Sequence, residues 1–235
     1  MSTYSKDEII KKLEVAKSEM WKFYSQDFVN YRGKTSDKEG YYYTEIIAKW
    51  LLDNIELFND IKMISRKNSY KVDSHDGKIK NEKSGREEEI IAMKLFDFSQ
   101  NQGKVFDIIG KIIDYQTPLK DIQTDKAGKI DLLAYNKNEK TLRILELKKP
   151  DSKETMLRCV LEAYTYLKIV DKAKLLKDFA LPEDTVIKAC PFVFVDGEQH
   201  KELKDNRENL ENLIKKLDIE IIYLKEEKGE YSIKK

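Results

Sequence analysis

The sequence predicts an α/β protein in which a mixed central β-sheet is flanked by helices. The first observation is a pair of apolar strand patterns, 129–135 and 141–149, joined by a short polar turn, which is typical of antiparallel neighbours. The second is that two later apolar segments, 187–195 and 219–224, each follow a helical pattern. That alternation favours parallel crossovers. Together the patterns indicate an α/β sandwich.

Helical periodicity dominates the N-terminal third of the chain. Apolar residues recur at helical spacing over 6–29, where Ser5 is the candidate N-cap, and again over 42–58. The chain therefore divides into residues 1–83, a mainly helical extension packed on the core, and residues 84–235, the core itself.

Two features of this extension have both a binding and a structural interpretation. His75 follows a segment predicted to be extended, 61–72, and lies in a polar turn beside Asp and Gly; a lone loop histidine of this kind is usually solvated rather than a metal ligand. The second feature is a set of aromatic side chains along the first helix, which either form a binding surface or pack the helix on its neighbours: Trp21, Phe23, Tyr24, Phe28 and Tyr31. We expect solvation in the first case and packing in the second.

Composition excludes several classes of protein. Charged residues make up 37 % and aromatic residues 10 % of the 235 residues, and the formal net charge of +1 gives no overall bias toward nucleic acid or membranes. Cys159 and Cys190 are far apart, which fits a reducing compartment and argues against a disulfide framework or a cysteine-based zinc site. No apolar stretch approaches about 18 residues, and the N-terminus lacks a signal-peptide pattern. We expect a cytoplasmic protein with no membrane partner.

The first core helix is predicted to begin at Ser84 or Gly85 and carries three glutamates in its first turn. Acidic side chains at a helix N-terminus complement the macrodipole, which is a sufficient structural explanation. The functional interpretation is that one of them faces the sheet. Glu88 shares a helical stripe with Leu95, so it is the preferred candidate, and Glu89 is the alternative.

The chain is organised around residues 128–148. Asp131 lies on the first strand of the predicted hairpin, whereas Glu146 and Lys148 lie on the second and point to the same face, because side chains alternate with period two. Apolar residues on both faces of the second strand predict a central strand covered on both sides. Charged groups are rarely buried there without a partner or a metal. The trio therefore indicates either a divalent-metal site or a Glu146–Lys148 salt bridge with Asp131 capping a turn.

The remaining core elements follow in order. A strand is predicted at 110–115, before the hairpin. After the hairpin, Asp151 or Ser152 caps a helix at 153–170, one stripe of which is polar and able to line a cleft. An amphipathic helix is predicted at 199–216.

These motifs resemble the PD-(D/E)xK nuclease superfamily, which has the restriction-endonuclease-like fold. The resemblance covers about 84–196 and extends to about 225, and it rests on four segments: Arg86-x-Glu88-Glu89-x-x-Ala92, Gly128-x-Ile130-Asp131, Ile144-Leu145-Glu146-Leu147-Lys148 and the helix from Arg158 to Tyr166. Two departures are visible. Ile130 replaces the proline of the family's name, and many recombination-type members have a glutamine where this chain has Arg158 or Glu162.

The resemblance implies a metal-dependent nuclease that hydrolyses phosphodiester bonds of DNA or RNA. Mg²⁺ or Mn²⁺ is expected on Asp131, Glu146, the backbone carbonyl of Leu147 and Glu88, with Lys148 orienting the attacking water. The cleft and the nucleic-acid contacts are expected to involve Lys129, Lys149, Lys153, Arg158, Glu162 and Tyr166. The alternative is a catalytically silent nuclease-fold module that binds nucleic acid or protein. DNA is the first expected partner, and the oligomeric state stays open, with a homodimer as one option.

Overall fold

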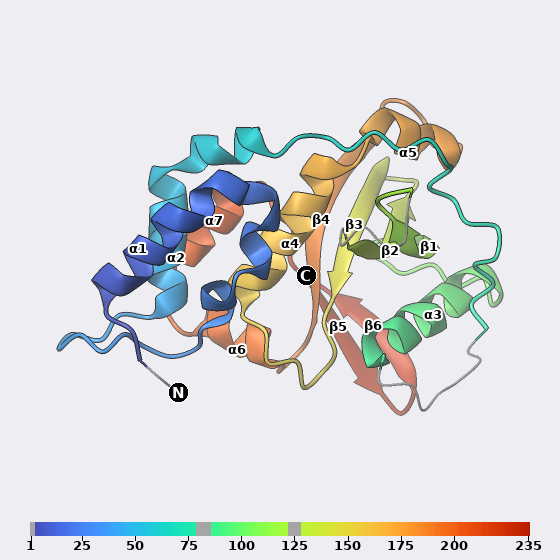
Figure 1. The fold of residues 1–235 in the computed structure, drawn as a ribbon. Helices are drawn as coiled ribbons and strands as arrows, with labels where there is room; N and C mark the ends of the chain where they lie inside the picture. The colour runs from blue at the N-terminus through green and yellow to red at the C-terminus, as the bar shows by residue number, and fades with distance from the viewer. Residues whose placement is uncertain (1–2, 79–85, 122–127) are drawn as a thin grey trace.

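The computed structural model describes residues 3–78, 86–121 and 128–235 (Figure 1). Its centre is a six-stranded sheet whose spatial order follows the chain. The strands are β1 (Lys111–Pro118), β2 (Lys129–Asn136), β3 (Thr141–Leu147), β4 (Val186–Phe194), β5 (Ile222–Glu227) and β6 (Glu230–Lys234). β1, β2 and β3 pair antiparallel, β3, β4 and β5 pair parallel, and β6 returns antiparallel to β5. The predicted mixed sheet with flanking helices is confirmed.

The β2–β3 hairpin is covered on both faces, as the apolar pattern predicted. Leu133 pairs with Ile144, and both side chains join the apolar cluster on one face, while the neighbouring pair Leu132 and Leu145 joins the cluster on the other. Every residue of β3 is buried. The strand ends at Leu147 rather than two residues later.

One helix covers each face beside the hairpin. α3 (Glu87–Gln100) places Ala92 in the cluster that contains Leu132, and α4 (Met156–Ile169) packs on the opposite face. The prediction that Asp151 or Ser152 caps the second helix is wrong. Thr155 is the N-cap, because its hydroxyl accepts a hydrogen bond from the amide of Arg158 at 3.2 Å.

The N-terminal extension consists of short helices: α1 (Lys6–Ala16), η1 (Lys17–Ser25), η2 (Asp27–Asn30), α2 (Tyr43–Asp53) and η3 (Ile55–Asp60). Ser5 and Glu8 form the N-terminal capping box of α1. The predicted single helix over 6–29 is wrong, because the backbone of Glu19 is non-helical, with φ −127° and ψ 53°. These helices lie beside α4 in Figure 1 and share one apolar cluster with it and with α7 (Glu208–Lys216).

Two further segments differ from the sequence pattern, and one helix was not predicted. The segment 61–72, predicted to be extended, joins no sheet, and its Tyr70 amide donates to the Asp178 carboxylate at 2.8 Å. The helix predicted over 199–216 is interrupted and forms α6 (Glu198–Lys204) and α7, and α5 (Lys172–Asp178) was not predicted.

None of the helices in the described ranges is long and apolar enough to cross a membrane.

His75 is not the solvated loop histidine that the sequence pattern suggested. Its Nδ1 lies 2.6 Å from Oδ1 of Asp114, and its ring stacks on Tyr115 with the centroids 4.4 Å apart. Asp114 is itself buried and accepts a hydrogen bond from the Thr117 hydroxyl at 2.7 Å. His75 therefore attaches its loop to edge strand β1.

Candidate active site at the end of the central strands

Asp131 connects three neighbouring strands through its carboxylate. Its Oδ2 accepts a hydrogen bond from the amide of Leu147 at 2.9 Å, and its Oδ1 accepts one from Nε2 of Gln116, also at 2.9 Å. Gln116 holds a left-handed backbone conformation, φ 47°, which is uncommon for a residue with a side chain. The aspartate is thus fixed from both sides, by β1 and by β3, at the point where the β2–β3 pairing ends.

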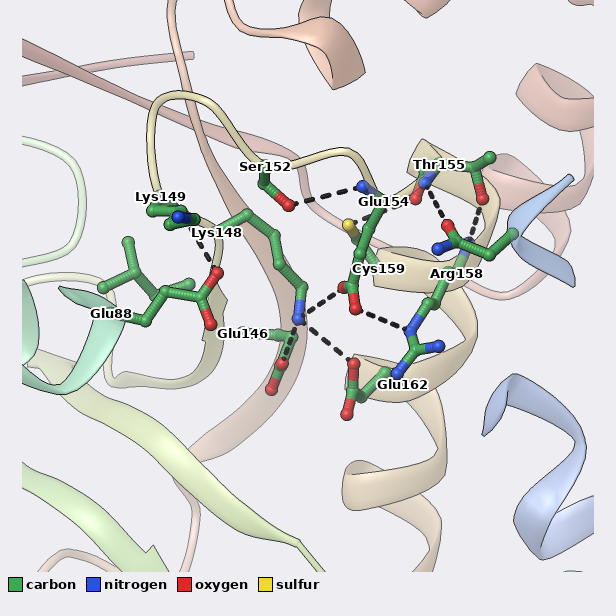
Figure 2. A network of polar contacts seen from close by, with 12 residues as sticks. Glu88, Glu146, Lys148, Lys149, Ser152, Glu154, Thr155, Arg158, Cys159 and Glu162 are labelled. Atoms are coloured by element: carbon green, nitrogen blue, oxygen red, sulfur yellow. Dashed lines mark hydrogen bonds and ion pairs between the residues drawn. The ribbon is translucent and has the colours of Figure 1, made fainter. Parts of the chain in front are cut away.

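The side chains of Glu146, on β3, and Lys148, just after it, lie on the same face of the sheet as that of Asp131, and this face is covered by α4. Figure 2 shows the Lys148 ammonium among carboxylates from two segments of the chain. Its Nζ lies 2.8 Å from Oε1 of Glu146 and 3.2 Å from Oε2 of Glu162 on α4. A third carboxylate, that of Glu154 in the loop before α4, lies 2.9 Å from the same nitrogen. Because the lysine side chain is only 6 % exposed, its charge depends on these partners rather than on water.

Burial and charge act on these groups in opposite directions. Burial lowers the pKa of Lys148, but Glu146 and Glu162 outweigh it and hold that pKa well above its usual value. Burial raises the pKa of Glu146 well above its usual value, and repulsion from Asp131 and Glu162 adds to the effect, so the ion pair with Lys148 does not offset it. Burial likewise raises the pKa of Asp131 to about 7. The lysine stays charged, whereas the two acids hold protons more tightly than in water.

Glu88 is the glutamate of α3 that reaches this site. Its Oε1 accepts a hydrogen bond from the amide of Lys149 at 3.1 Å, and its charge contributes to the raised pKa of Asp131. Glu89 pairs with Arg86 at 3.3 Å instead. Lys149 turns its ammonium outward, where it forms ion pairs with two acidic residues, 3.0 Å from Glu87 and 3.2 Å from Asp151.

The polar stripe of α4 closes the other side. Nε of Arg158 forms an ion pair with Glu154 at 3.0 Å, and the hydroxyl of Tyr166 donates to Oε1 of Glu162 at 3.0 Å. Lys129 and Lys153, which were also predicted to contact nucleic acid, are exposed. The sequence prediction had not included Glu154 or Gln116. The only local signal for Glu154 is its position four residues before Arg158, and nothing local marks Gln116.

The carboxylate oxygens of this site are the ligands that a hard divalent cation prefers, but they are not yet arranged around one metal position. Four carboxyl groups, those of Asp131, Glu146, Glu154 and Glu162, share this region with the cations of Lys148 and Arg158. Among the described residues, Oε2 of Glu146 is buried without a hydrogen-bond donor. No three His, Cys, Asp or Glu side chains within those residues are already placed to hold a metal ion. The excess of carboxylates and the free oxygen therefore suit a cation that binds by displacing Lys148 from part of its network.

Gly128 allows Tyr166 to approach the start of β2. A Cβ at this position would lie 1.9 Å from the Tyr166 hydroxyl oxygen and 2.7 Å from the ring carbon that bears it. We expect Gly128→Ala to lower the free energy of unfolding by about 1–3 kcal/mol, the usual cost of overpacking a buried site. Urea denaturation measures it. The double variant Gly128→Ala/Tyr166→Phe should recover part of the loss, and no recovery would show that the strain lies elsewhere.

Comparisons with known proteins give no family for this chain. No protein-family model, no curated protein and no solved structure matches it. The function is therefore inferred from the chemistry of these residues.

Proposed function

We propose that this protein is a metal-dependent nuclease that hydrolyses phosphodiester bonds of DNA or RNA, and that its core is restriction-endonuclease-like. The observation that carries the proposal is the convergence of Asp131, Glu146 and Lys148 on one face at the end of two central strands. Keeping two acids with raised pKa values beside a buried lysine costs stability, and such arrangements cluster at functional sites.

The order of elements supports the same proposal. An acid-headed helix, α3, precedes an antiparallel β1–β2–β3 unit, and α4 then leads to β4, which pairs parallel to β3. That order agrees with the motif sequence on which the family resemblance rests. The carboxylate of Glu88 approaches from α3 and that of Glu162 from α4.

Each side chain has a defined role in this proposal. Asp131 and Glu146 would hold Mg²⁺ or Mn²⁺, with Glu88 and the Leu147 carbonyl as further oxygen ligands. When bound, such a cation would supply Lewis acidity toward the scissile phosphate and would make water a better nucleophile. Gln116 and the Leu147 amide fix the Asp131 carboxylate. The Lys148 ammonium orients the attacking water and neutralises charge that develops on the phosphate.

One observation favours the second candidate, a catalytically silent module that binds nucleic acid or protein. Lys148 is engaged by three carboxylates at once. A lysine that stays in this network neutralises the acids and leaves little room for a cation. Metal binding therefore separates the two candidates.

Mn²⁺ should stabilise the wild-type protein and should fail to stabilise Glu146→Gln. A ligand that binds only the folded state adds about 2.7 kcal/mol at a concentration one hundred times its dissociation constant, and thermal denaturation with increasing Mn²⁺ measures this. Glu19→Gln, which alters a surface carboxylate paired with Lys22, is the control and should respond like the wild type. Equal responses of wild type and Glu146→Gln would favour the silent module. A crystal soaked in Mn²⁺ should show anomalous density between Asp131 and Glu146.

A further inference from the structure

The aromatic residues of η1 divide between the core and the surface. Phe23 is buried and stacks on Trp50, with the ring centroids 6.1 Å apart, so it packs as predicted. Trp21 is 36 % exposed and borders a cavity of about 470 Å³. We call this cavity the Trp21 groove, and its lining includes Trp21, Lys62, Ile64, Lys120 and Ile169.

Lysines surround the exposed indole. The ammonium of Lys22 lies 4.3 Å from the centre of the Trp21 ring and that of Lys120 lies 5.4 Å from it. Lys62 is exposed on the same groove. Within the described ranges, neither Lys62 nor Lys120 forms an ion pair with a carboxylate, so both are able to meet an anionic ligand. An aromatic platform with flanking lysines is the arrangement that holds nucleobases and phosphates.

The side of the Trp21 groove that carries Lys120 is held to the N-terminal extension by hydrogen bonds and an ion pair. The carbonyl of Lys120 accepts a hydrogen bond from the buried guanidinium of Arg66, and the adjacent Asp121 forms an ion pair with that arginine at 3.5 Å. The Asp121 carboxylate also accepts hydrogen bonds from the amides of Lys67 at 2.8 Å and Asn68 at 2.9 Å. The negative charge of Asp121 is therefore compensated, although Asp121 lines the groove. Asp60, the other acid that lines the groove, is also exposed.

A short chain of contacts connects the Trp21 groove to the candidate active site. Tyr24 lies one turn after Trp21 on η1, and its ring packs edge-on against Tyr166 with the centroids 6.0 Å apart. The Tyr166 hydroxyl donates to Glu162, which pairs with Lys148. The same helix thus borders both the groove and the tyrosine that contacts the site.

We propose that the Trp21 groove binds a single-stranded segment of the nucleic-acid substrate, with a base stacked on Trp21 and flanking phosphates on Lys62 and Lys120. Stacking needs an exposed base face, and the bases of a duplex present only their edges in the grooves. The groove therefore selects single strands, and either DNA or RNA supplies the required chemistry. That this strand is the substrate rests on the nuclease function proposed above.

Binding is tested without cleavage, in EDTA, on the full-length protein carrying Trp50→Phe, so that Trp21 is the sole tryptophan. A 20-nucleotide oligo-dT or oligo-U should quench Trp21 fluorescence, and a duplex of equal length should not. In the wild-type background, fluorescence anisotropy of a labelled oligonucleotide measures the affinity for single strands. Trp21→Ala should weaken this binding about 5- to 150-fold, and Trp21→Phe should weaken it less. Lys62→Gln and Lys120→Gln should each reduce the salt dependence of log K by about 0.7.

Tyr41→Ala is the matched control. Tyr41 is 40 % exposed and also has a lysine over its ring, Lys6 at 5.1 Å, but it borders a different cavity. Its removal should leave single-strand binding unchanged. Single-strand affinity that is equal in wild type and Trp21→Ala would overturn the proposal, as would equal losses in Trp21→Ala and Tyr41→Ala. Circular dichroism melting confirms that each variant is folded before binding is compared.

The two proposals fail in different ways. If single strands quench Trp21 but no metal supports cleavage, the groove stands and the nuclease function falls. If cleavage of single strands has the same KM in wild type and Trp21→Ala, the nuclease function stands and the groove falls.

Discussion

Asp131→Asn and Glu146→Gln should each reduce Mg²⁺- or Mn²⁺-dependent cleavage of nucleic acid by roughly 10³-fold or more. Each variant keeps the size of its side chain and removes one negatively charged oxygen ligand. Cleavage of labelled single- and double-stranded DNA and RNA measures the loss. Activity that survives both substitutions would contradict the assignment of the site.

The same two variants should be at least as stable as the wild type at pH 8 in EDTA. Burial raises the folded-state pKa of Asp131 to about 7, above an unfolded value of about 3.9. The folded state therefore holds this proton more tightly, and stability is lost as the pH rises from about 4 to about 7. Asparagine does not titrate, so it avoids this loss. We expect a gain of about 1 kcal/mol, because the amide replaces the Asp131 hydrogen bonds imperfectly.

Glu220→Gln is the matched control, and its stability should change in the opposite direction. Burial alone would raise the pKa of Glu220, but its hydrogen bonds with Arg143 and Lys235 lower it below the usual value. Its Oε2 lies 2.6 Å from Nε of Arg143, which is buried. This carboxylate therefore stabilises the fold when ionised. Glu220→Gln should lose stability at pH 8 and retain cleavage, since Arg143 lies near the opposite end of β3 from Lys148.

Lys148→Met should cost about 3–5 kcal/mol of unfolding free energy at pH 8, which is typical when one partner of a buried charge network is removed. The variant leaves the Glu146, Glu154 and Glu162 carboxylates close together without their shared cation. Urea denaturation in EDTA measures the cost. A loss below about 1 kcal/mol would show that the network behaves like a surface ion pair.

The deficit of Lys148→Met should shrink as the pH falls from 8 to 5. In the wild type, the Lys148 pKa is held well above its usual value, so its contribution is fully present across this range and is lost only near and above the ordinary lysine pKa. In the variant, Glu146 keeps a pKa that burial raises well above its usual value, so it takes up a proton on acidification, which removes part of the repulsion among the carboxylates. The double variant Lys148→Met/Glu146→Gln should regain part of the stability, and the double-mutant cycle gives the coupling between the two residues. Additive effects of the two substitutions on stability would contradict the proposed pairing.

Local patterning was enough to predict the central hairpin and the side of the strand on which its charges lie. The alternation of Glu146 and Lys148 with apolar neighbours has period two, and the polar turn before Thr141 is short, so the strand pairing depends on residues close in sequence. The capping box of Ser5 and Glu8 is local for the same reason. These features need no knowledge of the rest of the chain.

Tertiary contacts decided the features that the sequence pattern predicted wrongly or omitted. The carboxylate of Glu154 reaches Lys148 only because the loop after β3 folds back before Thr155 starts α4. Gln116 meets Asp131 only because β1 pairs with β2, and His75 finds its Asp114 partner across a long separation in sequence.

The groove at Trp21 shows the same limit. Helical spacing placed Trp21 and Phe23 together as aromatic residues of one predicted helix. After the helix breaks at Glu19 and packs beside α4, one ring is buried and the other is left exposed beside Lys120. Periodicity specifies which residues share a face, but burial is a property of what covers that face, and only the folded chain determines it.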